Sequence, residues 1–226
     1  PDAGFYRYLP KVPEKLQAGG DLQMLKVEGF SRLDGVLKLN HAMAFDWVDI
    51  KHPEQGHTKG THDGAGVVKQ GLQAGGSAFV ALEGCICHQG SIYFTSKAGG
   101  SARAGQVFRL DIAKNTLELI FEAADRGGFS GPDNITVSPQ GALMICEDRL
   151  GLSTKAQYLA GLDETGSLFA FCQINPHLRG SYAGHKLHKT ALKSEWAGVC
   201  FSADGKWMFV NIYNPAKGII LTFFGI

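Results

Sequence analysis

One hairpin pattern occurs three times in this chain, and it constrains the fold more than any other feature. Each copy has an apolar strand, a turn that ends in glycine and a second strand, with turn glycines at Gly90, Gly141 and Gly205. The middle copy, GPDNITVSPQGALMICED, runs from Gly131 to Asp148. Aliphatic residues that favour strands alternate with other residues in it, and the Ser-Pro-Gln-Gly segment between the two runs is typical of a tight turn. The repeat predicts an all-β protein of short antiparallel strands.

Further strand patterns flank these hairpins and extend the all-β prediction over the whole chain. Their ranges are residues 4–10, 22–27, 37–44, 45–50, 106–112, 117–122, 167–174 and 219–224. Between them we expect a polar surface loop and two insertions, at residues 52–76, 151–160 and 176–193. Groups of strands that recur about every 40–50 residues indicate the blades of a β-propeller. We therefore predict a single propeller domain over residues 1–226, with about four four-stranded blades.

The first strand of the chain predicts where this propeller begins. Its sequence, GFYRYLP, is similar to QVFRLDI, which is predicted to be an outer strand of a blade. The chain is thus expected to begin in mid-blade and to form the C-terminal part of a propeller. About four blades is the low end of the known range, so we expect an N-terminal segment outside this chain, or another chain, to complete the ring.

Composition excludes several classes of partner. The net charge of +1 gives no basis for binding nucleic acid or an anionic membrane surface. No apolar run approaches the ~18 residues of a membrane-spanning helix, and the chain does not open with a signal-peptide pattern. The five cysteines are an odd number, and four of them lie in predicted strands: Cys85, Cys87, Cys146 and Cys200. We predict small buried thiols there, without a disulfide framework.

Acidic and amide side chains stand near the start of the first strand in each repeat. Counting back from the turn glycines gives Glu83 in the first copy, Asp133 and Asn134 in the second, and Glu195 in the third. Equivalent positions of successive blades converge at one mouth of the central channel. We therefore expect these four side chains to lie near one another.

Two more acids, Glu147 and Asp148, end the second strand of the middle hairpin and return to the same mouth. Several carboxylates around one cavity repel one another unless protons or metal ions neutralise them. Oxygen ligands alone favour hard cations such as Ca²⁺. The alternative is that these side chains satisfy turns and link blades, as Asp and Asn often do at strand ends.

Other motifs favour no specific chemistry. The histidines between His52 and His62, together with His88, match no zinc spacing, and a solvated loop is the simpler interpretation. The same interpretation applies to His185 and His188. The chain has no GxSxG elbow, and GAGVVKQG lacks the Lys-Ser/Thr ending of a P-loop.

Three segments together resemble the shorter branch of the PhoX-type alkaline phosphatases: EGCICHQGSIYFTSKAGGSARAGQVFRLD, GPDNITVSPQGALMICED and SEWAGVCFSADGKWMFVNIYNP. The resemblance runs from about Gly4 to the end of the chain. It implies a six-bladed propeller, usually exported to the periplasm or the cell exterior, that hydrolyses phosphomonoesters. It also implies a cluster of Ca²⁺ and Fe³⁺ in the channel mouth.

The resemblance also assigns residues. The implied metal ligands are Glu83, Glu147, Asp148 and Glu195, with Asp133 and Asn134 from the Pro-Asp-Asn motif. Lys193, two residues before Glu195, is a candidate contact for the phosphate. The family's cysteine ligand to iron belongs to a segment that would precede Gly4. No residue is assigned as the nucleophile or as an acid–base catalyst.

The predicted function is therefore metal-dependent hydrolysis of a small phosphomonoester. Metal ions would bridge the phosphate oxygens while a basic side chain orients the phosphate. Two alternatives stay open. One is a calcium-dependent lactonase, a propeller family that also places Glu, Asn and Asp around one Ca²⁺. The other is a non-catalytic propeller that binds a partner on its face, because propellers host many functions.

Overall fold

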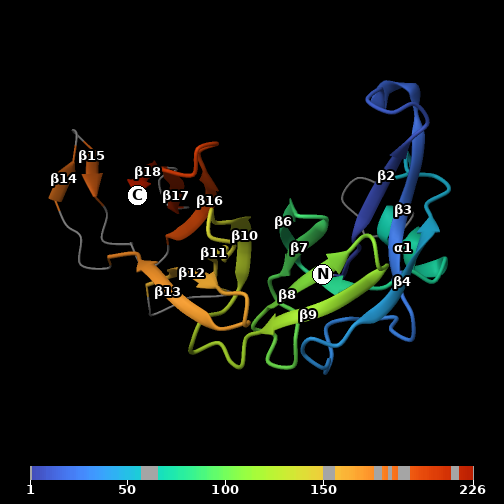
Figure 1. Ribbon diagram of the computed structural model, residues 1–226, viewed down its shortest axis with the longest axis horizontal. Helices are drawn as coiled ribbons and strands as arrows, with labels where there is room; N and C mark the ends of the chain where they lie inside the picture. The colour runs from blue at the N-terminus through green and yellow to red at the C-terminus, as the bar shows by residue number, and fades with distance from the viewer. Residues whose placement is uncertain are drawn as a thin grey trace.

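The computed structural model describes residues 2–56, 66–149, 156–175, 180–182, 185–187, 194–214 and 219–225. Most of these residues lie in short strands, and the described helices are α1 (Val67–Gln73) and a single 3-10 turn, η1 (Leu16–Ala18) (Figure 1). The prediction of an all-β protein is confirmed. In the described parts of the chain, neither helix has the length and apolar character needed to cross a membrane.

The largest sheet has seven antiparallel strands, and it joins what the sequence predicted as separate blades. In spatial order the strands are β2 (Tyr6–Pro10), β3 (Gly20–Val27), β4 (Met43–Asp49), β9 (Thr116–Glu122), β8 (Gln106–Asp111), β7 (Ser91–Ser96) and β6 (Leu82–His88). The junction is short, with Met43 opposite Leu117 and Ala44 opposite Thr116. These bonds merge β2–β4 with the four consecutive strands β6–β9 into one sheet, so separate propeller blades are not confirmed in this part of the chain.

The strand predicted over residues 37–44 is also wrong, because β4 begins only at Met43. Val36 and Leu39 are exposed, and Leu37 packs only partly buried against the apolar cluster that contains Met43. Asn40 has a positive φ of 55°, which an extended strand does not permit. The strand predicted at 45–50 belongs to the same element as Met43.

A second sheet contains four consecutive antiparallel strands. They are β10 (Pro132–Val137), β11 (Leu143–Glu147), β12 (Tyr158–Leu162) and β13 (Leu168–Gln173). Strand β12 lies partly in the predicted insertion 151–160, which is therefore wrong from Tyr158 onward. Its Ala-Gly centre carries no strand signal, but the close approach of the Phe169 ring to Gly161 explains the glycine: a Cβ there would lie 2.0 Å from a ring carbon.

The remaining sheets are smaller. One has three strands, β16 (Glu195–Phe201), β17 (Met208–Asn214) and β18 (Ile219–Gly225), and two are pairs, β14 (Gly180–Tyr182) with β15 (His185–Leu187) and β1 (Asp2–Ala3) with β5 (Phe79–Val80). All three predicted hairpins are confirmed as β6–β7, β10–β11 and β16–β17. The loop predicted over 52–76 contains α1, where Gly71 packs closely against Met24.

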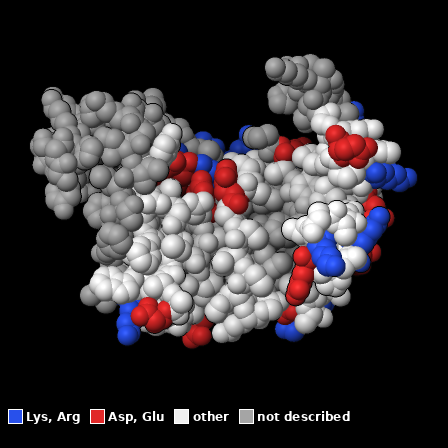
Figure 2. Space-filling model, turned by 90° about the horizontal axis from the view of Figure 1, so that it is seen from above, with Lys and Arg blue, Asp and Glu red and all other residues white. Residues whose placement is uncertain are grey.

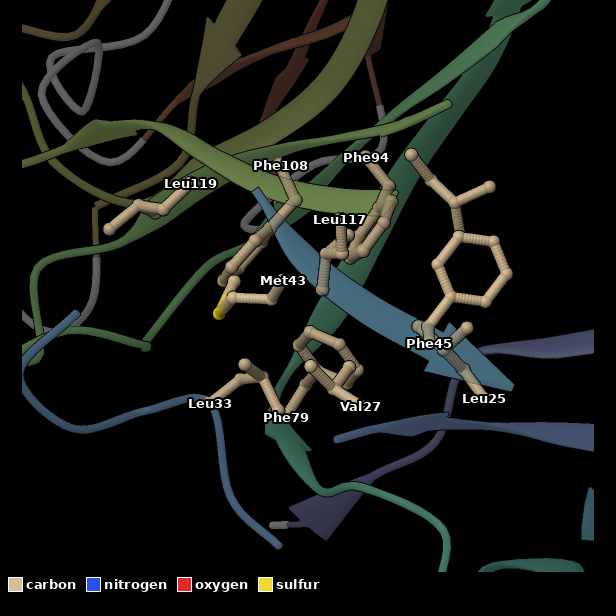
Figure 3. Packing of buried hydrophobic residues seen from close by; sticks show 11 residues of the cluster. Leu25, Val27, Leu33, Met43, Phe45, Phe79, Phe94, Phe108, Leu117 and Leu119 are labelled. Atoms are coloured by element: carbon tan, nitrogen blue, oxygen red, sulfur yellow. The ribbon is translucent and has the colours of Figure 1, made fainter. Parts of the chain in front are cut away.

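Apolar clusters lie within and between these sheets. In the first cluster the Phe94 and Phe108 rings stack 5.3 Å apart, and Phe79 meets both edge-on (Figure 3). A second cluster joins β7–β8 to the four-stranded sheet through Val107 and Ile135. The third joins that sheet to β16–β17. As a result β6, β10 and β16, the first strands of the three hairpins, stand next to one another (Figure 1).

The prediction of buried thiols is only partly correct. Cys146 is buried in the third cluster, whereas Cys85, Cys87 and Cys200 are exposed. The exposed three lie on the first strands β6 and β16, where alternate residues face away from the sheet-to-sheet contact. All five cysteines are free, so the predicted lack of a disulfide framework agrees with the structure.

Gly84 allows β6 and β10 to approach each other closely. A Cβ at this position would lie 2.4 Å from the carbonyl oxygen of Asp133 and 2.8 Å from the amide nitrogen of Ile135. Because both atoms belong to the backbone, neither can rotate away. We expect Gly84→Ala to lower the free energy of unfolding by about 1–3 kcal/mol, measured by urea denaturation.

Gly35→Ala is the matched control, because a Cβ there would meet nothing within 4 Å and the backbone needs no positive φ. Its midpoint should stay close to that of the wild type. Equal shifts for the two variants would show that the approach of β6 to β10 is not tight.

Candidate functional site

The three hairpins share one irregularity, and it determines where the candidate ligands lie. In each, the pairing register shifts by one residue near the start of the first strand, between Leu82 and Cys85, Pro132 and Ile135, and Ala197 and Cys200. Such bulges bend a strand and redirect its side chains, and they are frequent beside active sites. The bulges bring the starts of β6, β10 and β16 together at one end of the hairpins.

The bulges also correct the alignment made from the sequence. Counting from the turn glycines paired Glu83 with Asn134, but the pairing registers make Asp133 the equivalent of Glu83. The middle hairpin has one more residue between its bulge and its turn glycine, which displaced the count. Gly198 occupies the equivalent position in the third repeat, and Glu195 stands earlier, at the first residue of β16.

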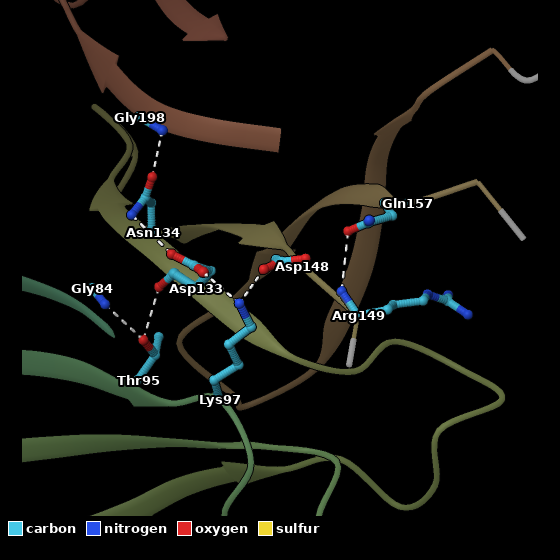
Figure 4. A network of polar contacts seen from close by, with 9 residues as sticks. All are labelled: Gly84, Thr95, Lys97, Asp133, Asn134, Asp148, Arg149, Gln157 and Gly198. Atoms are coloured by element: carbon cyan, nitrogen blue, oxygen red, sulfur yellow. Dashed lines mark hydrogen bonds and ion pairs between the residues drawn. The ribbon is translucent and has the colours of Figure 1, made fainter. Parts of the chain in front are cut away.

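A lysine that the sequence reasoning missed lies at the centre of the acids. Lys97 follows β7, and its Nζ donates hydrogen bonds to Asp133 Oδ2 at 3.1 Å and to Asp148 Oδ2 (Figure 4). The three side chains are mostly buried, with exposed fractions of 13% for Lys97, 18% for Asp133 and 23% for Asp148. One sequence signal could have revealed Lys97: it directly follows the second strand of its hairpin, as Asp148 does.

Asn134 and Thr95 hold Asp133 in place. The Asn134 side-chain amide donates to Asp133 Oδ1 at 3.0 Å, and its Oδ1 accepts from the backbone amide of Gly198 at 2.5 Å. Thr95 Oγ1 donates to the Asp133 carbonyl at 2.8 Å and accepts from the Gly84 amide at 2.9 Å (Figure 4). Hydrogen bonds therefore connect the three bulges directly and fix the Asp133 carboxylate.

Glu83 and Glu195 belong to the same electrostatic group. Glu83 is exposed, but partial desolvation by its neighbours, together with the charges of Asp133 and Asp148, raises its pKa. Burial and a hydrogen bond with Asp148 raise the pKa of Glu195 to about 8. Burial alone would lower the pKa of Lys97. Its bonds to Asp148 and Asp133 outweigh this effect, so the pKa of Lys97 is raised. At neutral pH the metal-free cluster thus holds an ammonium group and a protonated Glu195.

The raised pKa of Glu195 makes the stability of the metal-free protein depend on pH. A carboxyl group whose pKa is about 8 when folded, against 4.5 as its ordinary value, stabilises the fold fully below about pH 4.5 and loses that contribution as the pH rises through about 8. Glu83 acts in the same direction. In chelator we expect the melting temperature to fall between about pH 5 and pH 9, and Glu195→Gln to flatten this slope. An equally steep slope in that variant would contradict the pKa of Glu195.

Glu147 lies apart from this group and is bound by other partners. Its side chain is fully buried, and the backbone amides of Ser130 and Tyr158 donate to its two oxygens at 2.8 Å each. Arg149 Nε lies 2.8 Å from Glu147 Oε1. Successive side chains of a strand point to opposite faces, so Glu147 and Asp148 enter different networks. The structure therefore brings together Glu83, Asp133, Asn134, Asp148 and Glu195, without Glu147.

Several predicted residues cannot be placed, because Lys193, His57, His62 and His188 lie outside the described residues. His52 is exposed, and its Nδ1 lies 3.4 Å from Glu54 Oε1, in agreement with the predicted surface loop. Figure 2 shows acidic and basic atoms gathered near the middle of the face seen from above.

The chemistry of the cluster fits a hard cation. Among the described residues, no three or more His, Cys, Asp or Glu side chains are arranged tightly enough to hold a metal ion as they stand. Nevertheless the donors are carboxylate and amide oxygens, which Ca²⁺ prefers, and they already surround one cation, the Lys97 ammonium. Burial raises the pKa of the neighbouring Cys146 to about 12, so its thiol stays protonated in the metal-free protein.

The sequence also matches a known protein family. A family model described as alkaline phosphatase PhoX matches residues 1–216, which is most of the chain. No curated protein matches the chain.

Proposed function

Because this chain belongs to the PhoX alkaline phosphatase family, we propose that it hydrolyses phosphomonoesters with the help of metal ions held at the acid cluster. The observation that carries the proposal is the pair of carboxylates, Asp133 and Asp148, on one partly buried ammonium group, with Glu83 and Glu195 electrostatically coupled to them. So many carboxyl groups at one place are costly without cations among them. Links between hairpins account for Asn134, which accepts from the Gly198 amide, but not for the two carboxylates that share the Lys97 ammonium.

Among the described residues, some would bind the metal ions and others would position those ligands. Glu83, Asp133, Asp148 and Glu195 would hold hard cations, of which Ca²⁺ fits best, and these would neutralise charge on the phosphate. Asn134 and Thr95 fix Asp133 from its carboxylate and carbonyl ends, so that the ligand set is organised before substrate arrives. Fe³⁺, which the family resemblance implies, would need ligands from residues beyond this cluster.

The propeller remains part of the proposal. Four consecutive antiparallel strands occur twice, in β6–β9 and β10–β13, and apolar side chains fill the space between successive sheets. First strands that stand next to one another are what blades around a channel require. We further propose that the protein is exported to the periplasm or cell exterior, and that Lys193 contacts the phosphate, both by family resemblance.

A substrate panel tests the function. The intact protein, supplied with calcium and iron, is assayed on an aryl phosphate monoester, a diaryl phosphate diester and a γ-lactone. We expect the monoester to be hydrolysed fastest by a wide margin. Preferred opening of the lactone would indicate a lactonase, and bound metal without turnover of any substrate would indicate a binding scaffold.

A further inference from the structure

Lys97 binds two of the carboxylates that the proposed function assigns to metal ions. Its Nζ is bonded to one oxygen of Asp133 and one oxygen of Asp148, and the other oxygen of Asp133 accepts from the Asn134 amide. With only 13% of its side chain exposed, Lys97 is held inside the cluster. A cation that binds these same two carboxylates must therefore compete with the ammonium for their oxygens.

We propose that Lys97 is the built-in counter-ion of the metal-free site, which holds the acids together until a metal ion displaces it. The inference deepens the proposed function, because it assumes that the cluster binds metal. Lysine suits this role, since its ammonium is a compact charge on a flexible stem and can move aside once replaced. The carboxylates then exchange one cation for another, and the folded arrangement of the bulges survives in both states.

Two opposite consequences follow for the same substitution. Removing the ammonium leaves several acids close together with no cation, so the metal-free fold should lose stability. Removing it also removes the competitor, so calcium should bind more tightly. Removing any nearby ammonium also relieves its repulsion of Ca²⁺, so displacement itself is read from the reactivity of Lys97 with and without calcium.

The test compares Lys97→Met with Lys114→Met in the intact protein. Lys114 pairs with Asp111 on the surface, with 76% of its side chain exposed, and lies outside the cluster. In chelator, Lys97→Met should melt at a clearly lower temperature than the wild type, while Lys114→Met should not. In a calorimetric titration with Ca²⁺ alone, Lys97→Met should bind at least about tenfold more tightly, equivalent to ~1.4 kcal/mol. Unchanged or weaker binding would overturn the proposal.

A wild-type measurement keeps the proposal testable if Lys97→Met does not fold. Reductive methylation followed by mass spectrometry reports the reactivity of each lysine. Lys97 should react slowly in chelator and several times faster with saturating Ca²⁺, whereas Lys114 should react equally in both. Equal protection of Lys97 in the two conditions would contradict its displacement.

These readouts separate the inference from the proposed function, because none of them uses a phosphate ester. Tighter calcium binding by Lys97→Met in a protein that hydrolyses no monoester would support the counter-ion role and reject the phosphatase. Weaker calcium binding by Lys97→Met, with monoester hydrolysis by the wild type, would reject the counter-ion role and support the phosphatase.

Discussion

Glu195→Ala is expected to lower kcat/KM for an aryl phosphate by at least about 100-fold, because a metal at the cluster contributes several kcal/mol to transition-state stabilisation. Glu195 is the first residue of β16 and the cluster's only described acid from the third hairpin. Asp148 raises the pKa of Glu195, so the two carboxyl groups, from the middle and the third hairpin, are electrostatically coupled. Losing Glu195 removes a ligand and opens one side of the site. Steady-state kinetics with saturating calcium, together with calcium stoichiometry, measures both effects.

Glu28→Ala is the control for that experiment. Glu28 is an exposed acid in a turn after β3, so the same deletion of a carboxylate there should leave kcat/KM unchanged. If Glu195→Ala keeps the activity and the calcium content of the wild type, Glu195 is not a metal ligand and the site must lie elsewhere.

Glu147→Ala is expected to destabilise the fold by about 3–5 kcal/mol, the usual effect of removing one partner from a buried ion pair. The substitution leaves the Arg149 guanidinium buried without its counter-charge, and it removes the acceptor for the amides of Ser130 and Tyr158. Urea denaturation measures the loss. Calcium affinity, scored under conditions where the variant is folded, should stay near the wild-type value.

Glu118→Ala is the matched comparison, because Glu118 pairs with Arg109 at 2.6 Å across β8 and β9 in a partly exposed position. This pair should contribute below about 1 kcal/mol. A Glu147→Ala protein that is as stable as the wild type but binds calcium poorly would make Glu147 the ligand that the family resemblance implied.

The hairpins were predictable from the sequence because their signals are local. Alternating apolar residues and a glycine turn identify β10–β11 without reference to the rest of the chain, and the same holds for the other two copies. The approach of Glu83 to Asp133 followed from equivalent positions in a repeat, whereas Glu195 stands three residues before the equivalent position, Gly198. The repeat did not predict the pairing register. The middle hairpin has one additional residue between its bulge and Gly141, so counting back from the turn glycine is off by one residue.

The features that sequence reasoning missed depend on long-range contacts. In the sequence, Lys97 is an ordinary lysine at the end of a strand. Only the fold shows that Asp133 and Asp148, from the next sheet, bind its ammonium group. Glu147 and Asp148 are adjacent in sequence, but their side chains point in opposite directions at the end of β11. Glu147 therefore accepts from the Ser130 amide, whereas Asp148 binds Lys97. Strand β12 was hidden because Gly161, normally a strand breaker, is required beneath the Phe169 ring.

Chelation tests directly whether metal ions at the acid cluster hydrolyse phosphomonoesters. The intact protein is stripped with a chelator, dialysed and assayed on an aryl phosphate before and after calcium is restored, with iron supplied throughout. We predict that stripping abolishes hydrolysis, that calcium restores it in the wild type, and that calcium does not restore it in Glu195→Ala. Full activity in the stripped protein, or no hydrolysis with both metals present, would contradict the account.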